Sequence, residues 1–272
     1  ESLATRSTVY SGDLFAGKTV VVSGAGGGLG LAIAALFARL GASLAINGRD
    51  EEKLASAKEF LESLGAKVFA RTMTIRDPEQ VTEFVGEVNQ EFGSIDVLVN
   101  NAGGQFPQAA LDFSPKGWSA VIDTNLNGTW WVMQSTARHW VEHKQPGSIV
   151  NIVADIWRGM PGIAHTCAAR AGVIFLSKSV AVEWAPHDIR VNCVAPGCCE
   201  SSGFSRYPED GAATFQDSNP MRHAGDEWDV AVAYMAANSG KFITGEVLNI
   251  DGGQQMWGDP WPTGRPDYFR IA

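Results

Sequence analysis

Short runs of β-branched and apolar residues alternate with longer segments in which apolar positions recur every three or four residues. This alternation is typical of β-α-β units and predicts a parallel sheet whose strands are joined by helices. Seven runs have the length and composition of strands: Thr19–Val22, Ser43–Ile46, Lys67–Thr72, Ile95–Asn100, Gly147–Val153, Ile189–Val194 and Glu246–Ile250. The pattern therefore predicts the α/β fold class.

Two helical segments carry signals for where they begin and end. Asp77 is suited to cap a helix that starts at Pro78, and the apolar positions that follow lie on one face until Gly93. The segment 54–64 repeats this plan and is followed by Gly65. Both helices are expected to lie between strands.

Neither an internal repeat nor a Pro/Ser-rich linker divides the 272 residues, so we expect a single domain over 1–272. Two regions interrupt the alternation. Residues 200–221 are rich in Ser, Gly, Pro and Asp, which predicts a loop after the sixth strand. Residues 254–272 form an irregular tail with Trp257 and Trp261, and its aromatic content indicates that it packs on something.

Composition favours a small-molecule partner. The chain has 21 basic and 30 acidic side chains and no cluster of Lys or Arg, which argues against nucleic acid and anionic membranes. Its most apolar stretch, Leu31–Ala38, is too short to span a bilayer, and no export signal is visible. The four cysteines lack the spacing of a zinc site or a disulfide framework, so we expect reduced thiols and a cytoplasmic location: Cys167, Cys193, Cys198 and Cys199.

A glycine-rich segment, Ser23–Gly30, separates the first strand from an apolar helix. Residues without side chains allow a pyrophosphate to approach the backbone amides at the start of a helix. The alternative is a tight strand-to-helix turn with no ligand. The order of strand, turn and helix favours dinucleotide binding.

The spacing of Gly24, Gly28 and Gly30 resembles that of the short-chain dehydrogenase/reductase family. Further motifs of the family occur in the same order, and the resemblance runs from about Gly17 to Gly253. They are NNAG at 100–103, DTN at 123–125, VNCVAPG at 191–197 and DGG at 251–253. The resemblance implies a single-domain Rossmann-type, doubly wound sheet of seven parallel strands, and an assembly that is usually a homotetramer.

The resemblance also implies a nicotinamide dinucleotide cofactor. The acidic residue that would bind the adenosine ribose in an NAD enzyme falls at Gly48 and is absent, whereas Arg49 can contact a 2′-phosphate. Asp50 is more simply explained as the cap of the following helix. The alternative to phosphate binding by Arg49 is that it is a solvated surface charge. We favour NADP, with NAD possible. The expected contacts are Gly24, Gly28, Leu29, Gly30, Arg49, Thr74, Ile75, Asn101, Ala102, Gly103, Arg170, Pro196, Gly197 and Ser201.

The reaction centre departs from the family pattern. Most members use a Ser, a Tyr and a Lys, and these places hold Val153, Thr166 and Arg170, so that only Asn125 of the usual four remains. A Thr hydroxyl is far less acidic than a phenol and Val has no donor. Ordinary ketone reduction or alcohol oxidation therefore lacks its acid.

The sequence resembles the peroxisomal trans-2-enoyl-CoA reductases and the 2,4-dienoyl-CoA reductases, and the resemblance includes these departures from the usual Ser, Tyr and Lys. In such enzymes hydride goes to the β-carbon of a conjugated C=C bond, and an enolate develops on the carbonyl oxygen, which needs hydrogen-bond donors. The shared segments are GGQF at 103–106, KGW at 116–118, NLNGT at 125–129, AARAGV at 168–173, EWA at 183–185 and FITG at 242–245.

The residues that would do this chemistry have structural alternatives. Asn125, Asn127 and Thr166 are candidate enolate donors, although Asn127 and Thr166 are as easily explained by bonds to backbone. Asp155 and His165 are candidate sources of the α-carbon proton, and water is a third. Arg170 is expected to hold ribose hydroxyls.

The substrate and the reaction remain open between alternatives. Residues 200–272 carry five basic and eleven acidic side chains, which does not favour the phosphates of CoA, and Trp157 lies near the predicted cleft. A hydrophobic cyclic enone therefore competes with an enoyl thioester. A carbonyl reductase or alcohol dehydrogenase with a relocated acid, and a non-catalytic dinucleotide-binding protein, are the alternative functions.

Overall fold

A computed structural model describes residues 3–200, 215–226 and 232–256. Its centre is a seven-stranded sheet in the order β3-β2-β1-β4-β5-β6-β9, and every neighbouring pair is parallel. The strands are β1 (Thr19–Ser23), β2 (Ser43–Gly48), β3 (Val68–Thr72), β4 (Val97–Asn100), β5 (Gly147–Ile152), β6 (Ile189–Pro196) and β9 (Val247–Ile250). The predicted Rossmann-type fold and its seven strands are confirmed.

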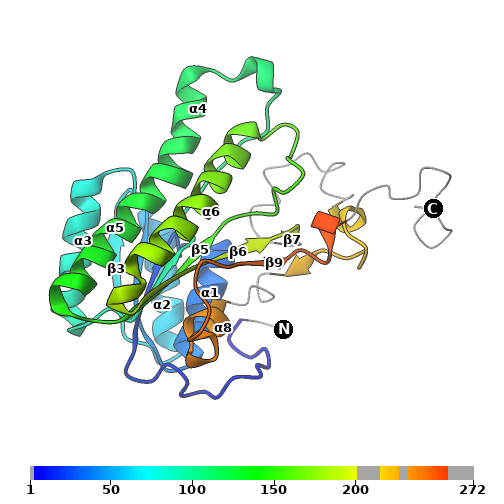
Figure 1. The fold of residues 1–272 in the computed structure, drawn as a ribbon. Coiled ribbons are helices and arrows are strands. Elements are labelled where there is room, and N and C mark those ends of the chain that lie inside the picture. The colour runs from blue at the N-terminus through cyan, green and yellow to red at the C-terminus, as the bar shows by residue number, and fades with distance from the viewer. Residues whose placement is uncertain (1–2, 201–214, 227–231, 257–272) are drawn as a thin grey trace.

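Helices cover both faces of the sheet (Figure 1). One face packs against α1 (Gly28–Arg39), α2 (Glu51–Ser63) and α8 (Val232–Ala236). The other packs against α3 (Pro78–Phe92), α5 (Thr129–His143) and α6 (Ala164–Trp184). Each face has its own buried apolar cluster, as expected for a doubly wound sheet. Further helices are α4 (Pro115–Ile122), η1 (Ala110–Asp112), η3 (Ala185–His187), η5 (Phe215–Ser218), η6 (Asn238–Gly240) and η7 (Gln254–Met256).

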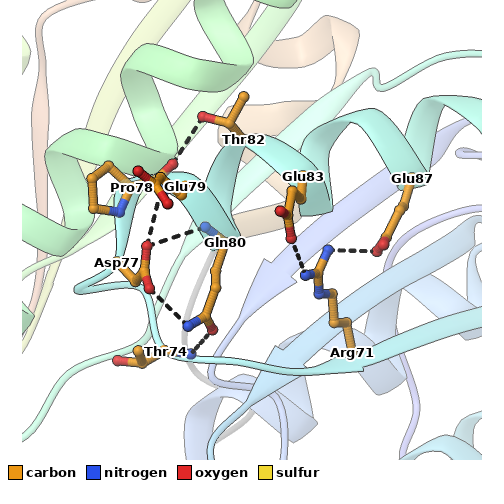
Figure 2. A network of polar contacts seen from close by, with 9 residues as sticks. All are labelled: Arg71, Thr74, Asp77, Pro78, Glu79, Gln80, Thr82, Glu83 and Glu87. Atoms are coloured by element: carbon orange, nitrogen blue, oxygen red, sulfur yellow. Dashed lines mark hydrogen bonds and ion pairs between the residues drawn. The ribbon is translucent and has the colours of Figure 1, made fainter.

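The two helices with predicted start and stop signals begin and end as expected. The Asp77 carboxylate accepts the backbone N–H of Glu79 and of Gln80 at the start of α3, as Figure 2 shows, and Gly93 ends this helix with a φ of +78°. Asp50 accepts the N–H of Lys53 at the start of α2. Asp50 is thus a helix cap.

Three features of the structure are not visible in the sequence pattern. Residues Asp123–Gly128 form a π-helical turn, labelled η2, between α4 and α5. A second sheet pairs β7 (Cys199–Glu200) with β8 (Gly225–Asp226), so the predicted loop at 200–221 starts inside a short strand. The predicted tail at 254–272 begins with η7, and its residues 257–272, with Trp257 and Trp261, lie outside the described residues.

All four cysteines are free thiols, as expected. Within the described ranges, no helix is both long enough and apolar enough to cross a membrane.

Candidate active site

The glycine-rich segment forms a cradle between β1 and α1. Gly24 has a φ of +70°, and a methyl group added there would lie 2.7 Å from the Cα of Ala102. One added at Gly30 would lie 2.3 Å from the carbonyl oxygen of Gly24. Helix α1 begins at Gly28 with no side-chain cap and no acidic residue in its first turn, which leaves its first N–H groups for an anion. These features fit a dinucleotide pyrophosphate.

The segment after β4 is fastened to this cradle by two polar side chains. The Oγ of Ser23 accepts the backbone N–H of Asn101 and of Ala102, at 3.1 and 3.0 Å. The Asn101 amide donates to the carbonyl oxygens of Ser23 and Gly24. Asn101 and Ala102 therefore lie beside the glycine cradle, and Gly103 follows them in the chain.

The adenosine end of the expected cofactor site has one unpaired arginine among the described residues. Arg49 is exposed at the end of β2 and forms no ion pair there. The nearby Arg71 is engaged by Glu83 and Glu87, at 2.6 and 2.8 Å, as Figure 2 shows. Arg49 is therefore available to bind an anionic group.

Thr74 and Ile75 are the two residues expected near the adenine amino group. The backbone N–H of Thr74 donates to the side-chain oxygen of Gln80 at 3.3 Å (Figure 2). Ile75 is buried, and a methyl group added at Gly128 would lie 2.7 Å from its Cγ1. Neither side chain carries the carboxylate or amide that usually binds this amino group.

Asn125 lies in the π-helical turn, and its amide is fully engaged with backbone. Its two N–H bonds donate to the carbonyl oxygens of Gly104 and Val121, at 2.7 and 2.9 Å, and its Oδ1 accepts the N–H of Gly104 at 3.2 Å. An enolate would therefore find no free N–H on Asn125 in this arrangement. The side chain instead holds the loop after β4 in place.

The other two candidate donors also have local partners. The Asn127 amide donates to Asp123 at 2.8 Å. Thr166 is buried, and its Oγ1 lies 3.3 Å from the Nδ1 of His165, which also accepts the Thr166 N–H at 2.8 Å. Thr166 therefore has a partner for its hydroxyl without a substrate.

His165 is a fully buried imidazole between two aromatic rings. The ring centroids of Phe113 and Phe106 lie 4.4 and 4.7 Å away, and burial lowers the pKa of His165. Because Nδ1 accepts the N–H of Thr166, the ring is neutral with its hydrogen on Nε2. This protonation state does not supply a proton from Nδ1 to Thr166.

Arg170 lies one helical turn after Thr166 on α6 and is 8% exposed. A methyl group added at Gly103 would lie 2.3 Å from Nη2 of Arg170 and 2.7 Å from Oδ1 of Asn125. The guanidinium therefore lies against the segment that follows β4. Burial lowers the pKa of Arg170 to about 10, so it stays charged at neutral pH.

Asp155 is a buried carboxyl beyond the end of β5. Its backbone N–H donates to the carbonyl oxygen of Pro196 at the end of β6. Burial first, and then the nearby charge of Asp251, raise the pKa of Asp155. Asp251 in turn accepts the N–H groups of Gly253 and Gln255.

Asp251 is a site residue that the sequence analysis did not predict. Its DGG motif follows β9, the strand next to β6, and this position is the signal that could have identified it. A methyl group added at Gly197 would lie 2.8 Å from the Cα of Asp251, so Pro196 and Gly197 lie against this segment.

Val153 is buried and has no polar group. Ser201 lies outside the described residues.

Comparison with known proteins gives matches over most of the chain. A family model described as enoyl-(acyl carrier protein) reductase matches residues 24–255. The chain is 34% identical over 252 residues to a probable 2,4-dienoyl-CoA reductase of Bacillus subtilis, a match that covers 90% of this chain and 98% of that protein. It is 36% identical over 241 residues to a 3-oxoacyl-(acyl-carrier-protein) reductase of Thermotoga maritima, with 87% and 97% covered.

Solved structures agree with these matches. A short chain dehydrogenase of Bacillus anthracis aligns with a TM-score of 0.84 at 34% identity and covers 92% of this chain and 100% of its own. A citronellol catabolism dehydrogenase of Pseudomonas aeruginosa aligns with a TM-score of 0.82, also at 34% identity, with 91% and 99% covered. With the family's motifs in order on this fold, the chain belongs to the short-chain dehydrogenase/reductase family and is an oxidoreductase.

Proposed function

We propose that this oxidoreductase uses NADP to reduce a C=C bond conjugated to a carbonyl group. The observation that carries the proposal is the absence of the family's acid: Val153 has no donor and the Thr166 hydroxyl lies against His165. Reduction of a conjugated C=C bond does not require an immediate proton on oxygen. The similarity to proteins named 2,4-dienoyl-CoA reductases supports the same reaction.

The cofactor site fits a nicotinamide dinucleotide on its own geometry. A bound NADPH would supply the hydride that reaches the β-carbon of the substrate. The glycine cradle at Gly24–Gly30 and the N-terminus of α1 would hold its pyrophosphate, and Asn101–Gly103 would border it. Arg49 would bind the 2′-phosphate, which favours NADP over NAD.

Asn125 and Asp155 have different roles in this proposal. Asn125 is a positioning residue, because its amide holds the backbone of Gly104, whose neighbour Gly103 lies beside Arg170. Asp155 gives the α-carbon its proton, directly or through water, because burial and Asp251 favour its protonated form. Thr166 and Asn127 keep their local hydrogen bonds.

The substrate is either an enoyl thioester or a hydrophobic cyclic enone. The net charge of −6 over residues 200–272 argues for the uncharged enone. The names of the relatives argue for the thioester. The same comparisons contain a 3-oxoacyl-(acyl-carrier-protein) reductase and a citronellol catabolism dehydrogenase, so ketone reduction is the second candidate function.

We also propose that the protein is a cytoplasmic homo-oligomer, most simply a tetramer. Its four free thiols are consistent with a reducing compartment. Helices α5 and α6 expose large apolar side chains on the outer face of the molecule, and a second copy would cover them: Val141, Phe175 and Val182.

A substrate panel tests the proposed function. The protein is incubated with NADPH and separate sets of enones, enoyl thioesters and saturated ketones, while NADPH oxidation is followed by absorbance and products by mass spectrometry. Turnover of the conjugated sets alone is the expected result. Turnover of saturated ketones favours the second candidate, and NADPH binding without any turnover favours a non-catalytic role.

A further inference from the structure

Arg170 is a buried positive charge without a counter-ion among the described residues. None of the ion pairs or hydrogen bonds present there involves its guanidinium. In the described part of the chain, the one ionisable group that influences the pKa of Arg170 is the Cys193 thiol, and burial raises the pKa of that thiol to about 11, so it is neutral. Burying an uncompensated charge is costly, and such a group is expected to meet an anion during function.

The expected role of Arg170, holding the hydroxyls of the nicotinamide ribose, does not remove this cost. Ribose hydroxyls accept hydrogen bonds but are neutral. The proposed reaction creates one new negative charge, the enolate on the substrate's carbonyl oxygen. A charge that appears only as the reaction proceeds is stabilised preferentially in the transition state.

The other candidate donors of the site are already engaged. Both N–H bonds of Asn125 donate to backbone, one N–H of the Asn127 amide donates to Asp123, and the Thr166 hydroxyl lies 3.3 Å from His165. Arg170, by contrast, presents a planar group with five N–H donors beside Gly103 and the loop that Asn125 holds.

We infer that the Arg170 guanidinium is the catalytic group that binds the enolate oxygen, in place of the tyrosine that this family normally uses. The inference rests on the proposed function. In the step concerned, hydride from a bound NADPH would form a C–H bond at the β-carbon, the C=C π pair would move to the bond between the α-carbon and the carbonyl carbon, and the carbonyl π pair would move to the oxygen as the enolate charge. Protonation of the α-carbon would then restore the carbonyl group. Arg170 keeps its own protons throughout and acts only by charge and hydrogen bonding.

The test compares Arg170→Gln, Arg170→Lys and a control, Lys67→Gln, which removes an exposed charge just before β3. We measure the Kd for NADPH by calorimetry, kcat at saturating NADPH with a conjugated substrate, and the Tm. Arg170→Gln should lower kcat about 10²–10³-fold, as the loss of one oxyanion donor does, with less than a tenfold change in Kd. Arg170→Lys keeps the charge but loses the planar fork, so about a tenfold loss in kcat is expected.

The Tm separates this role from a structural one. Removal of an uncompensated buried charge should leave the Tm of Arg170→Gln unchanged or raise it, whereas Lys67→Gln should leave kcat, Kd and Tm unchanged. A kcat for Arg170→Gln that returns to the wild-type value at saturating NADPH shows a ribose anchor only and overturns the inference. A lower Tm also overturns it. If the unaltered protein reduces no conjugated substrate, it is the proposed function that fails.

Discussion

At the scale of single residues, the sequence predicts which side chains gather at the site better than it predicts what they do there. The motifs place Asn125, Thr166 and Arg170 close together, and the structure does so. The hydrogen bonds of Asn125 to Gly104 and Val121 depend on the path of the backbone, which side-chain identity does not specify. For the same reason, the influence of Asp251 on Asp155 becomes visible only in three dimensions.

Cofactor preference is tested at Arg49. Arg49→Ala should weaken NADPH binding by about 1–3 kcal/mol, because one charge-assisted hydrogen bond is lost, and should leave NADH binding unchanged. Calorimetric titration with both cofactors measures this. Lys58→Ala, on α2, is the control and should change neither affinity. Equal losses for NADPH and NADH on changing Arg49 would show that this arginine does not bind the 2′-phosphate.

The pH dependence of turnover tests Asp155. Its pKa is raised above the usual 3.8, so the protonated form exists below the raised pKa and disappears as the pH rises through it. If the protonated carboxyl is the donor, kcat should fall along this limb of the pH profile. Asp155→Asn should have a lower kcat and lack the limb. A profile that is the same in both proteins would assign the proton to another source.

At the scale of secondary structure, strong periodic patterns predict the main helices and strands. Very short elements and long-range pairings are not predicted by such patterns. The capped helix at Pro78–Phe92 carries its signals locally, in Asp77 and Gly93. The pairing of β7 with β8 involves two residues on each side, which is too short for a period to show. In the π-helical turn at Asp123–Gly128, backbone hydrogen bonds join residues about five apart, whereas in an α-helix they join residues about four apart. The spacing of apolar residues does not reveal this difference.

The cradle between β1 and α1 can be tested with a pair of glycine variants. Gly30→Ala places a methyl group 2.3 Å from the carbonyl oxygen of Gly24 and 2.4 Å from the amide of Asn101. We expect a loss of about 1–3 kcal/mol in unfolding free energy and weaker NADPH binding. Gly86→Ala, in the exposed middle of α3 with no atom within 4 Å, should instead add about 0.5–1 kcal/mol and keep the affinity. Urea titration and calorimetry measure both effects, and equal behaviour of the two variants would contradict the close packing of the cradle.

At the scale of the whole molecule, the outer face of α5 and α6 is expected to join copies of the chain. Phe175 and Val182 are 68% and 76% exposed. They lie two turns apart on one face of α6. Phe175→Glu should reduce the molar mass measured by light scattering during size-exclusion chromatography, because a charge would be buried in the contact. Val9→Glu, at an exposed N-terminal position, is the control. A monomeric unaltered protein, or an unchanged mass for Phe175→Glu, would show that this face does not mediate assembly.

The reaction class itself is tested by following the label from deuterated NADPH. The protein reduces a substrate that contains both a conjugated C=C bond and its carbonyl group, with deuterium at the transferable position of the nicotinamide, and NMR locates the deuterium in the product. Because the site lacks the family's acid, we expect deuterium at the β-carbon and an intact carbonyl group. Deuterium on a carbinol carbon would contradict C=C reduction and establish carbonyl reduction in its place.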